Sequence, residues 1–153
     1  MIRPATTSEA AAVAAMYQAL TKEMASLAPQ VLRPLSVPDP ALFRDYSQDP
    51  ASAVLVATEA AQLQGFALVV TAETGVEPEA VPHRFAYVAA LYVAPAARHA
   101  GLGRQLMAAV AAWQQAQRLD FIQLDVLGAN QAARQFYASL GYATENLTLR
   151  KRP

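Results

Sequence analysis

Residues 85–117, FAYVAALYVAPAARHAGLGRQLMAAVAAWQQAQ, decide how this chain folds. Tyr87–Val93 is a nearly continuous apolar run, which predicts a strand buried on both faces. Pro95 has no N–H group to donate to a sheet, so it marks the end of strand pairing. The stretch therefore predicts a strand, a glycine-containing loop and an amphipathic helix, in that order. The apolar helical face comprises Leu102, Leu106, Ala109, Val110 and Trp113.

The loop between this strand and this helix has the features of an anion site. The first N–H groups of a helix have no partner within the helix, and they lie at the positive end of its dipole. A phosphate or pyrophosphate suits such a position. Gly101 and Gly103 would let an anion approach the backbone closely, and Arg98 and Arg104 add positive charge.

Several phosphate-binding motifs compete for this loop. A P-loop requires a Lys-Ser/Thr pair after its glycines, and none follows here. A Rossmann motif requires Gly or Ala where Leu106 stands, with its glycines directly after the strand. Arg98-x-x-Gly101-x-Gly103 instead resembles the acetyl-CoA motif of the GNAT superfamily of N-acetyltransferases, Arg/Gln-x-x-Gly-x-Gly/Ala. A glycine-containing loop with no ligand is the remaining alternative, because short motifs often match by chance.

A second motif follows after one helix and one further strand. The string NQAARQFYASLGY, residues 130–142, resembles the second GNAT signature, Asn-x-x-Ala-x-x-Phe-Tyr-x-x-x-Gly-Phe/Tyr. Two motifs in the correct order are much more specific than either alone, so the chain is identified as resembling GNAT enzymes over most of its length. The fixed positions are filled by Asn130, Ala133, Phe136, Tyr137, Gly141 and Tyr142.

The composition narrows the classes of function. A net charge of zero, with only 16% charged residues, argues against a nucleic-acid partner. The chain has no cysteine, which excludes disulfides, thiolate nucleophiles and cysteine metal sites and is compatible with the cytoplasm, where we expect the protein. No apolar run has the length of a membrane span, so no membrane partner is expected. His83 and His99 lack the spacing of metal ligands, and no metal is expected.

The order of segments predicts one α/β domain over residues 1–153. We expect a mixed central sheet with an antiparallel N-terminal half, a parallel strand pair and helices on both faces. The GNAT resemblance implies the same fold, and it implies that the parallel strands splay apart to admit the pantetheine arm. The first half is expected to contain an edge strand at Met1–Pro4, a helix capped by Thr6 and Glu9 and ending near Leu27, and a short helix containing Phe43 and Tyr46. A hairpin is expected to follow, with strands at Ala53–Thr58 and Leu63–Thr71 joined by a turn at Ala60–Gln62. The second half is expected to contain strands at Phe85–Val93 and Phe121–Leu127, each followed by a helix, and a last strand at Glu145–Arg150.

The resemblance also implies roles for individual residues. The Leu91 N–H is the implied oxyanion donor, and Tyr137 is the implied acid for the departing thiolate. Asn130 is expected to hydrogen-bond the pantetheine arm, with Ala133 and Phe136 packing nearby. Backbone N–H groups of the loop are expected to hold the pyrophosphate. The expected cofactor-binding residues are Leu91, Tyr92, Val93, Arg98, His99, Ala100, Gly101, Leu102, Gly103, Arg104, Asn130, Ala133, Phe136 and Tyr137.

Each of these roles has a purely structural alternative. Phe136 and Tyr137 are also suited to the core, and Asn130 is also suited to capping the helix that it precedes. Phe43 and Tyr46 fit either a helix that covers the sheet or a surface that contacts substrate.

The general base is missing from its usual place. Many GNAT enzymes carry a carboxylate on the strand before the phosphate loop, where this chain has Ala89 and Ala90. The nearest candidates by strand position are His83, Glu73, Glu59 and Tyr87, and none of them is favoured.

The function implied by the resemblance is an N-acetyltransferase. It would move an acetyl group from acetyl-CoA directly to a primary amine of a small molecule, peptide or protein. The missing carboxylate motivates an alternative, a catalytically silent acyl-CoA-binding or sensor domain. A homodimer is compatible with both.

Overall fold

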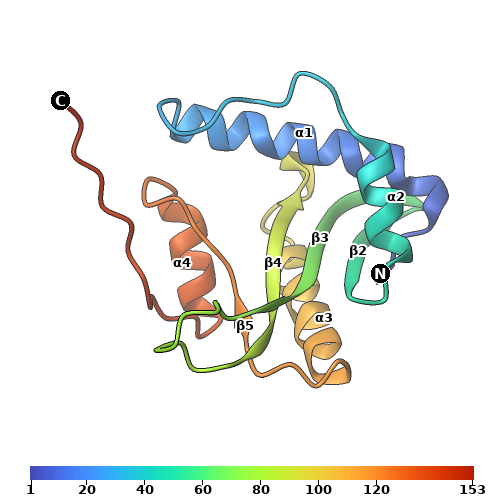
Figure 1. Ribbon diagram of the computed structural model, residues 1–153. Coiled ribbons are helices and arrows are strands. Elements are labelled where there is room, and N and C mark those ends of the chain that lie inside the picture. Colours follow the sequence, from blue (N-terminus) through green and yellow to red (C-terminus); the bar gives the residue numbers. More distant parts are fainter.

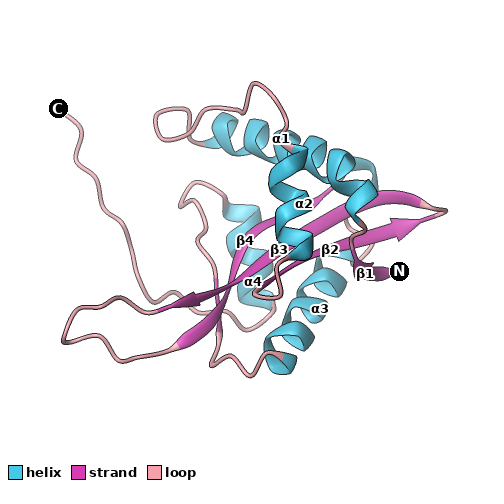
Figure 2. Cartoon of the chain, turned by 45° about the vertical axis from the view of Figure 1, so that its right-hand side comes forward, coloured by secondary structure: helices cyan, strands magenta, loops and turns pink.

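A computed structural model describes residues 1–153 as one mixed sheet with helices on both faces (Figures 1 and 2). The strand order is β1-β2-β3-β4-β5; β1 to β4 are antiparallel, and β5 is parallel to β4. The predicted fold class is therefore confirmed. The elements are β1 (Ile2–Pro4), the 3₁₀ turn η1 (Thr7–Glu9), α1 (Ala10–Leu27), α2 (Pro40–Gln48), β2 (Ser52–Glu59), β3 (Gln62–Glu73), β4 (Arg84–Val93), η2 (Pro95–Ala97), α3 (Leu102–Ala116), β5 (Ile122–Gln123) and α4 (Gln131–Ser139).

The core has two layers, one on each face of the sheet. α1 and α2 cover one face, where Val13 and Phe43 pack against Phe66. α3 covers the other face, where Leu106 and Val110 pack against the same strands, as Figure 2 shows. The alternation of apolar residues on β2, β3 and β4 supplies both layers, because successive strand side chains point to opposite faces.

The start of α1 follows from a local capping arrangement. The Glu9 carboxylate accepts a hydrogen bond from the Thr6 N–H at 2.8 Å, as the predicted capping box requires. The same carboxylate pairs with Arg3 at 2.7 Å. The hydrogen bond from Arg3 is the largest cause that lowers the pKa of Glu9 to about 2. This pairing attaches the first helix to the edge strand.

The predicted turn between β2 and β3 is confirmed, and its sequence is unusual for a turn of this type. Ala60 and Ala61 have φ values of 47° and 64°, as a two-residue type I′ turn requires. Asn-Gly is the preferred pair at such a turn, because positive φ is costly for alanine. This turn sets the register of the two strands that form the middle of the sheet.

A β-bulge in β4 changes which way its side chains face. Leu68 pairs with Ala90, but the next residue, Val69, pairs with Val88, so Ala89 is unpaired. Ala90 lies in the α1/α2 layer and Val88 in the α3 layer. The extra residue therefore places Ala89 on the same face as Ala90.

Two predicted strands differ from the structure. Only Ile122–Gln123 of the Phe121–Leu127 segment is a strand, because β4 and β5 separate beyond it. The strand predicted at Glu145–Arg150 is wrong: this segment is an extended tail that runs away from the body (Figure 1), with Leu147 and Leu149 78% and 90% exposed. Its alternating pattern suits a strand, but a strand also requires a neighbour to accept its hydrogen bonds. No helix of the structure combines the length and apolarity needed to cross a membrane.

Candidate active site

β4 and β5 pair at only two positions and then separate. Ala86 pairs with Ile122 and Tyr87 with Gln123, while β4 continues to Val93. One edge of the second half of β4 is thus free of strand pairing. This opening is the slot between β4 and β5.

The N–H groups along β4 show which residues face the slot. The Ala86 N–H donates to the Phe121 carbonyl on the β5 side, at 2.9 Å, whereas the Ala94 N–H donates to the Gln64 carbonyl on the β3 side, at 2.7 Å. N–H groups alternate between the two edges of a strand, with one shift at the bulge. Leu91, an odd number of residues before Ala94, therefore directs its N–H into the slot. This direction fits the predicted oxyanion donor.

A row of free N–H groups follows at the end of β4. None of the N–H groups from His99 to Arg104 donates a backbone hydrogen bond within the chain. His99 and Gly101 have φ values of 65° and 81°, which curl the loop into the start of α3. A run of unpaired N–H groups at a helix N-terminus is an anion-binding arrangement. These unpaired N–H groups lie in the loop where the sequence predicts the pyrophosphate site.

Arg98 has a different position from the one its predicted role suggests. Its Nε donates to the Val93 carbonyl at 2.8 Å, and its Nη2 donates to the Glu23 carboxylate on α1 at 2.6 Å. Its guanidinium also lies 5.7 Å from the centre of the Tyr92 ring. Arg98 therefore ties the loop to β4 and α1. Arg104 has only a long contact of 3.4 Å to the Ser139 hydroxyl, so its charge is available at the loop.

α4 lies beside the start of α3. A Cβ built on Gly103 would lie 3.2 Å from the Phe136 ring, so glycine at this position permits the close approach of the two helices. Phe136 also packs against the α3 layer of the core, which supports its structural reading. Asn130 caps α4, with its Oδ1 accepting from the Ala133 N–H at 3.1 Å. Its amide NH₂ forms no hydrogen bond in the chain and remains free for a ligand.

Tyr137 is enclosed by aromatic rings and has a free hydroxyl. Its ring contacts Phe136 and Tyr142, with centroids 5.1 Å and 5.6 Å away, and its hydroxyl forms no hydrogen bond in the chain. Burial is the main cause that raises the pKa of Tyr137 to about 12. The phenol therefore keeps its proton at neutral pH and can act as a proton donor.

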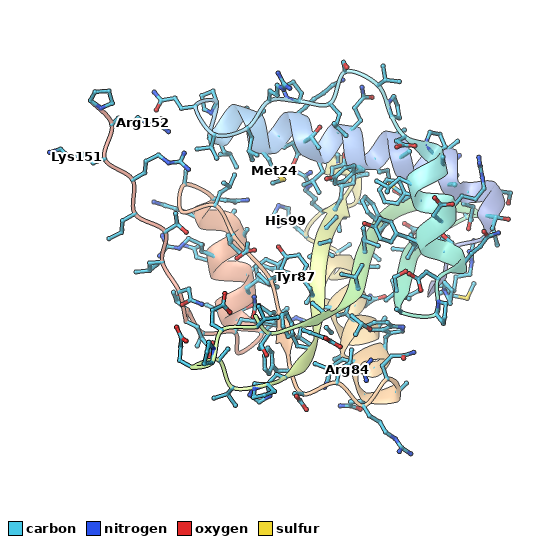
Figure 3. All side chains as sticks on the ribbon, viewed as in Figure 1. Met24, Arg84, Tyr87, His99, Lys151 and Arg152 are labelled. Atoms are coloured by element: carbon cyan, nitrogen blue, oxygen red, sulfur yellow. The ribbon has the colours of Figure 1, made fainter.

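A carboxylate that the sequence analysis did not select lies across from β4. The Tyr87 hydroxyl donates to Asp125 Oδ2 at 2.6 Å, and this bond is the main cause that raises the pKa of Tyr87 to about 12. Asp125 is exposed and lies two residues beyond the end of β5. In the view of Figure 3, Tyr87 and His99 both lie between β4 and α4.

The other predicted base candidates lie away from the slot. His83 Nδ1 is 2.9 Å from Asp120 Oδ2, at the opposite end of β4 from the phosphate loop. Glu73 lies at the same end, 3.7 Å from Arg84. Glu59 ends β2 at the hairpin. Of these candidates only Tyr87 contacts the slot, and it does so as a hydrogen-bond donor to a carboxylate.

The short helix has a structural role. Phe43 is 1% exposed and makes edge-to-face contacts with Tyr17 and Phe66, so it belongs to the core. Tyr46 also packs against that layer. The reading of α2 as a covering helix is thus confirmed for these two residues.

The family model for the acetyltransferase (GNAT) family matches residues 13–142, which is most of the chain. This chain belongs to the GNAT acetyltransferase family. The matched region includes β4, the phosphate loop and all of α4. Among curated proteins, none matches the chain in sequence.

Several solved structures share this fold. A mutant BH1408 protein from Bacillus halodurans is 24% identical, with 100% of this chain and 99% of that chain covered and a TM-score of 0.91. The aminoglycoside N-acetyltransferase AAC(6')-Iy, solved in complex with CoA, is 19% identical, with 100% of both chains covered and a TM-score of 0.67. An aminoglycoside acetyltransferase from an uncultured soil metagenomic sample, in complex with sisomicin, is 14% identical, with 100% of this chain and 94% of that chain covered and a TM-score of 0.68. At these identities the likeness supports the fold.

Asp125 is the residue of this site that sequence reasoning missed. The only signal is a single carboxylate inside the apolar run FIQLDVL, residues 121–127. A charged residue is rare in a strand buried on both faces, so this departure itself indicates an exposed or functional position. The motifs could not reveal its partner, because Tyr87 lies 38 residues away in sequence.

Proposed function

We propose that this GNAT protein transfers an acetyl group from acetyl-CoA to a primary amine. The observation that carries the proposal is the row of unpaired N–H groups from His99 to Arg104, which leads directly from the slot. This row fits a pyrophosphate, and the slot beside it fits an extended arm that adds to the free edge of β4. The likeness to AAC(6')-Iy, solved with CoA, supports the same cofactor.

Each step of the proposed acetyl transfer can be assigned to a residue of the slot. Acetyl-CoA would supply a thioester, whose carbonyl carbon is open to attack by a neutral amine. The Leu91 N–H would donate to the carbonyl oxygen, which gains negative charge as the carbon–nitrogen bond forms. The Tyr137 hydroxyl would give its proton to the sulfur as the carbon–sulfur bond breaks. The Asn130 amide and the loop N–H groups would hold the rest of the molecule in place.

Thermal unfolding tests the cofactor assignment. A ligand that binds only the folded state raises the melting temperature by mass action, so acetyl-CoA and CoA should both do so. An equal concentration of ADP serves as a control for a pyrophosphate without the pantetheine arm and should give a smaller shift. No shift at millimolar CoA would contradict the assignment.

Turnover separates an enzyme from a silent acyl-CoA-binding domain. Release of the CoA thiol is measured with a panel of monoamines, diamines, amino acids, peptides and an aminoglycoside. A transferase accelerates thiol release with at least one amine, and the product carries one acetyl group by mass. Binding without turnover on any amine would favour the silent domain. The free Tyr137 hydroxyl supports the transferase, because a silent domain needs no proton donor there.

The acceptor is proposed to be an amine on a small molecule or a peptide. Two structures of this fold belong to aminoglycoside acetyltransferases, which supports a small-molecule acceptor. The need for acetyl-CoA supports the expected cytoplasmic location. Both statements are tested by the acceptor panel and by fractionation of cells that express the protein.

The proposed assembly is a homodimer in which the C-terminal tail pairs with a second copy. The support is that 145–150 has a strand pattern but no neighbour, while the chain from 124 to 127 has no strand pairing either. Light scattering should give the mass of a dimer for the parent. Leu147→Asp with Leu149→Asp should give the mass of a monomer, because both exposed side chains then oppose burial. A monomeric parent would contradict the proposal.

A further inference from the structure

We propose that Asp125 binds the ammonium group of the acceptor and takes its proton, while Tyr87 holds the carboxylate in position. This inference rests on the proposed acetyl transfer and supplies the base that β4 lacks. It also defines the acceptor as a compound with one cationic amine on an apolar or aromatic body.

The register of β4 and β5 places Asp125 at the level of the missing carboxylate. Tyr87 and Gln123 form the last pair before the strands separate. Asp125 lies two residues beyond Gln123, and Ala89 lies two residues beyond Tyr87. The carboxylate thus faces the bulge residue across the slot. The Ala89 side chain is small and exposed.

The faces of the two strands agree with this placement. Ile122 and Leu124 pack against the α3 layer, so Asp125 faces the other side of the sheet. Tyr87 pairs with Val70, which packs against the α1/α2 layer, so Tyr87 faces the same side as Asp125. The 2.6 Å bond between their side chains requires this arrangement. An acceptor would therefore approach from the α1/α2 side, opposite to the face covered by α3.

Asp125 keeps binding capacity beyond its bond to Tyr87. A carboxylate has about four lone-pair sites on its two oxygens, and only Oδ2 is bound here, by one donor. No arginine, lysine or histidine pairs with Asp125. An exposed carboxylate with a fixed orientation and no cationic partner is complementary to an incoming ammonium group.

The surroundings of Asp125 favour a single positive charge on the acceptor. Two other carboxylates lie at the far end of β4, away from Asp125, and each has a cationic neighbour: Asp120 Oδ2 is 2.9 Å from His83, and Glu73 is 3.7 Å from Arg84. The Phe121 ring, 36% exposed, stacks on Phe85 with centroids 5.0 Å apart, so part of its surface is open on the same face. One available carboxylate, with open aromatic surface on the same face of the sheet, fits an apolar monoamine better than a polycation.

The proton balance of the step is complete with these residues. The Asp125 carboxylate takes one proton from the ammonium group, which frees the nitrogen lone pair to attack, and releases this proton to solvent at the end of the cycle. A second proton leaves the nitrogen as the amide forms and passes to solvent. Tyr137 gives its proton to the departing sulfur and regains one from solvent. The carbon–nitrogen bond forms and the carbon–sulfur bond breaks, with no change of oxidation state.

The test compares 2-phenylethylamine with its 2,2-difluoro analogue, whose fluorines leave the amine largely neutral at pH 7. Asp125→Asn preserves the size of the side chain, and its amide oxygen can still accept from Tyr87. We expect kcat/KM for 2-phenylethylamine to fall about 100-fold, at the low end of general-base effects. We expect a loss below about tenfold for the difluoro analogue, because its neutral amine lacks the proton that Asp125 would take and needs no partner for a positive charge.

Two further variants complete the experiment. Tyr87→Phe releases Asp125 from its donor and should lower kcat/KM by about three- to tenfold for the protonated amine only, because Asp125 loses its fixed orientation. Glu59→Gln removes an exposed carboxylate at the end of β2 and should leave both amines unaffected. The acetyl-CoA-induced rise in melting temperature should persist in all three variants.

The outcomes separate this inference from the proposed function. An unchanged kcat/KM in Asp125→Asn, or an equal loss with both amines, would overturn the role of Asp125. Faster turnover of an aminoglycoside than of 2-phenylethylamine would overturn the single-charge acceptor. Absence of turnover on every amine of the panel by the parent, with acetyl-CoA bound, would instead overturn acetyl transfer itself.

Discussion

The proposed cofactor side and the proposed acceptor side of the slot are built in different ways. On the cofactor side, contiguous backbone from His99 to Arg104 presents the unpaired N–H groups. On the acceptor side, one hydrogen bond joins Tyr87 and Asp125, which come from different strands. The first side depends on backbone conformation within a short motif, whereas the second depends on side chains brought together by strand register. Substitutions on the two sides should therefore have separable effects.

Among the substitutions that test this difference, Gly101→Glu should have the largest effect, on the affinity for acetyl-CoA. It places a negative side chain at a position with φ of 81°, in the proposed pyrophosphate site. Like-charge repulsion of about 1–4 kcal/mol and left-handed strain of about 1–2 kcal/mol act together. We expect acetyl-CoA binding, measured by calorimetry, to weaken at least about 100-fold.

Gly141→Glu is the matched control for this prediction. Gly141 has φ of 90°, and as at Gly101 no atom lies within 4 Å of an added Cβ. It carries the same backbone strain two residues beyond the end of α4, outside the row of unpaired N–H groups from His99 to Arg104. Equal loss of acetyl-CoA binding in both variants would show that strain, and not position, causes the effect.

Gly103→Ala should have an intermediate effect on the contact between the two helices of the cofactor side. The new methyl group would lie 3.2 Å from the Phe136 ring, closer than normal packing allows. Overpacking of this kind costs about 1–3 kcal/mol of unfolding free energy, measured by urea denaturation. Adding Phe136→Leu should restore part of the loss, because the two residues share one contact. Strictly additive losses would contradict this packing account.

Glu9→Gln should have the smallest effect and should leave both sides of the slot intact. The folded pKa of Glu9 is lowered to about 2 from an ordinary value of 4.5. Its stabilisation is thus complete above about pH 4.5 and is lost as the pH falls toward 2. Because the pair with Arg3 is partly exposed, we expect about 1 kcal/mol at pH 7 and a much smaller difference at pH 2. Altered Michaelis constants in Glu9→Gln would contradict the claim that this residue acts on stability alone and not on the slot.

The sequence predicts the cofactor side much better than the acceptor side. The motif around Gly101 and Gly103 predicts the loop, because a few adjacent residues determine a turn and a helix start. Asp125 could not be assigned, because its role depends on the splay of β4 and β5 and on the bulge at Ala89. These features arise from pairing between distant segments. The strand predicted at 145–150 was wrong for the same reason. Its alternating sequence pattern is local, whereas strand pairing requires a partner from a distant part of the chain.

Arg98 is a second residue whose contacts could not be predicted from the sequence. A basic residue in a phosphate motif predicts a charge for the anion, yet its guanidinium binds Glu23, 75 residues away in sequence. The motif therefore predicts where Arg98 lies along the chain, and the packing of α1 against the loop determines what its charge contacts. Local sequence patterns predict helices, strands and their ends, whereas contacts between residues that are distant in sequence become known only from the tertiary structure.

Turnover of Tyr137→Phe tests acetyl transfer in this slot most directly. The variant removes one hydroxyl that has no partner, so the melting temperature and acetyl-CoA binding should change little. With the acceptor amine of the parent, kcat should fall about ten- to ten-thousand-fold. Because the pKa of Tyr137 is raised to about 12, the parent should show no loss of kcat from this group between pH 7 and about 10. Unchanged kcat in Tyr137→Phe, with acetyl transfer rate-limiting, would contradict the account.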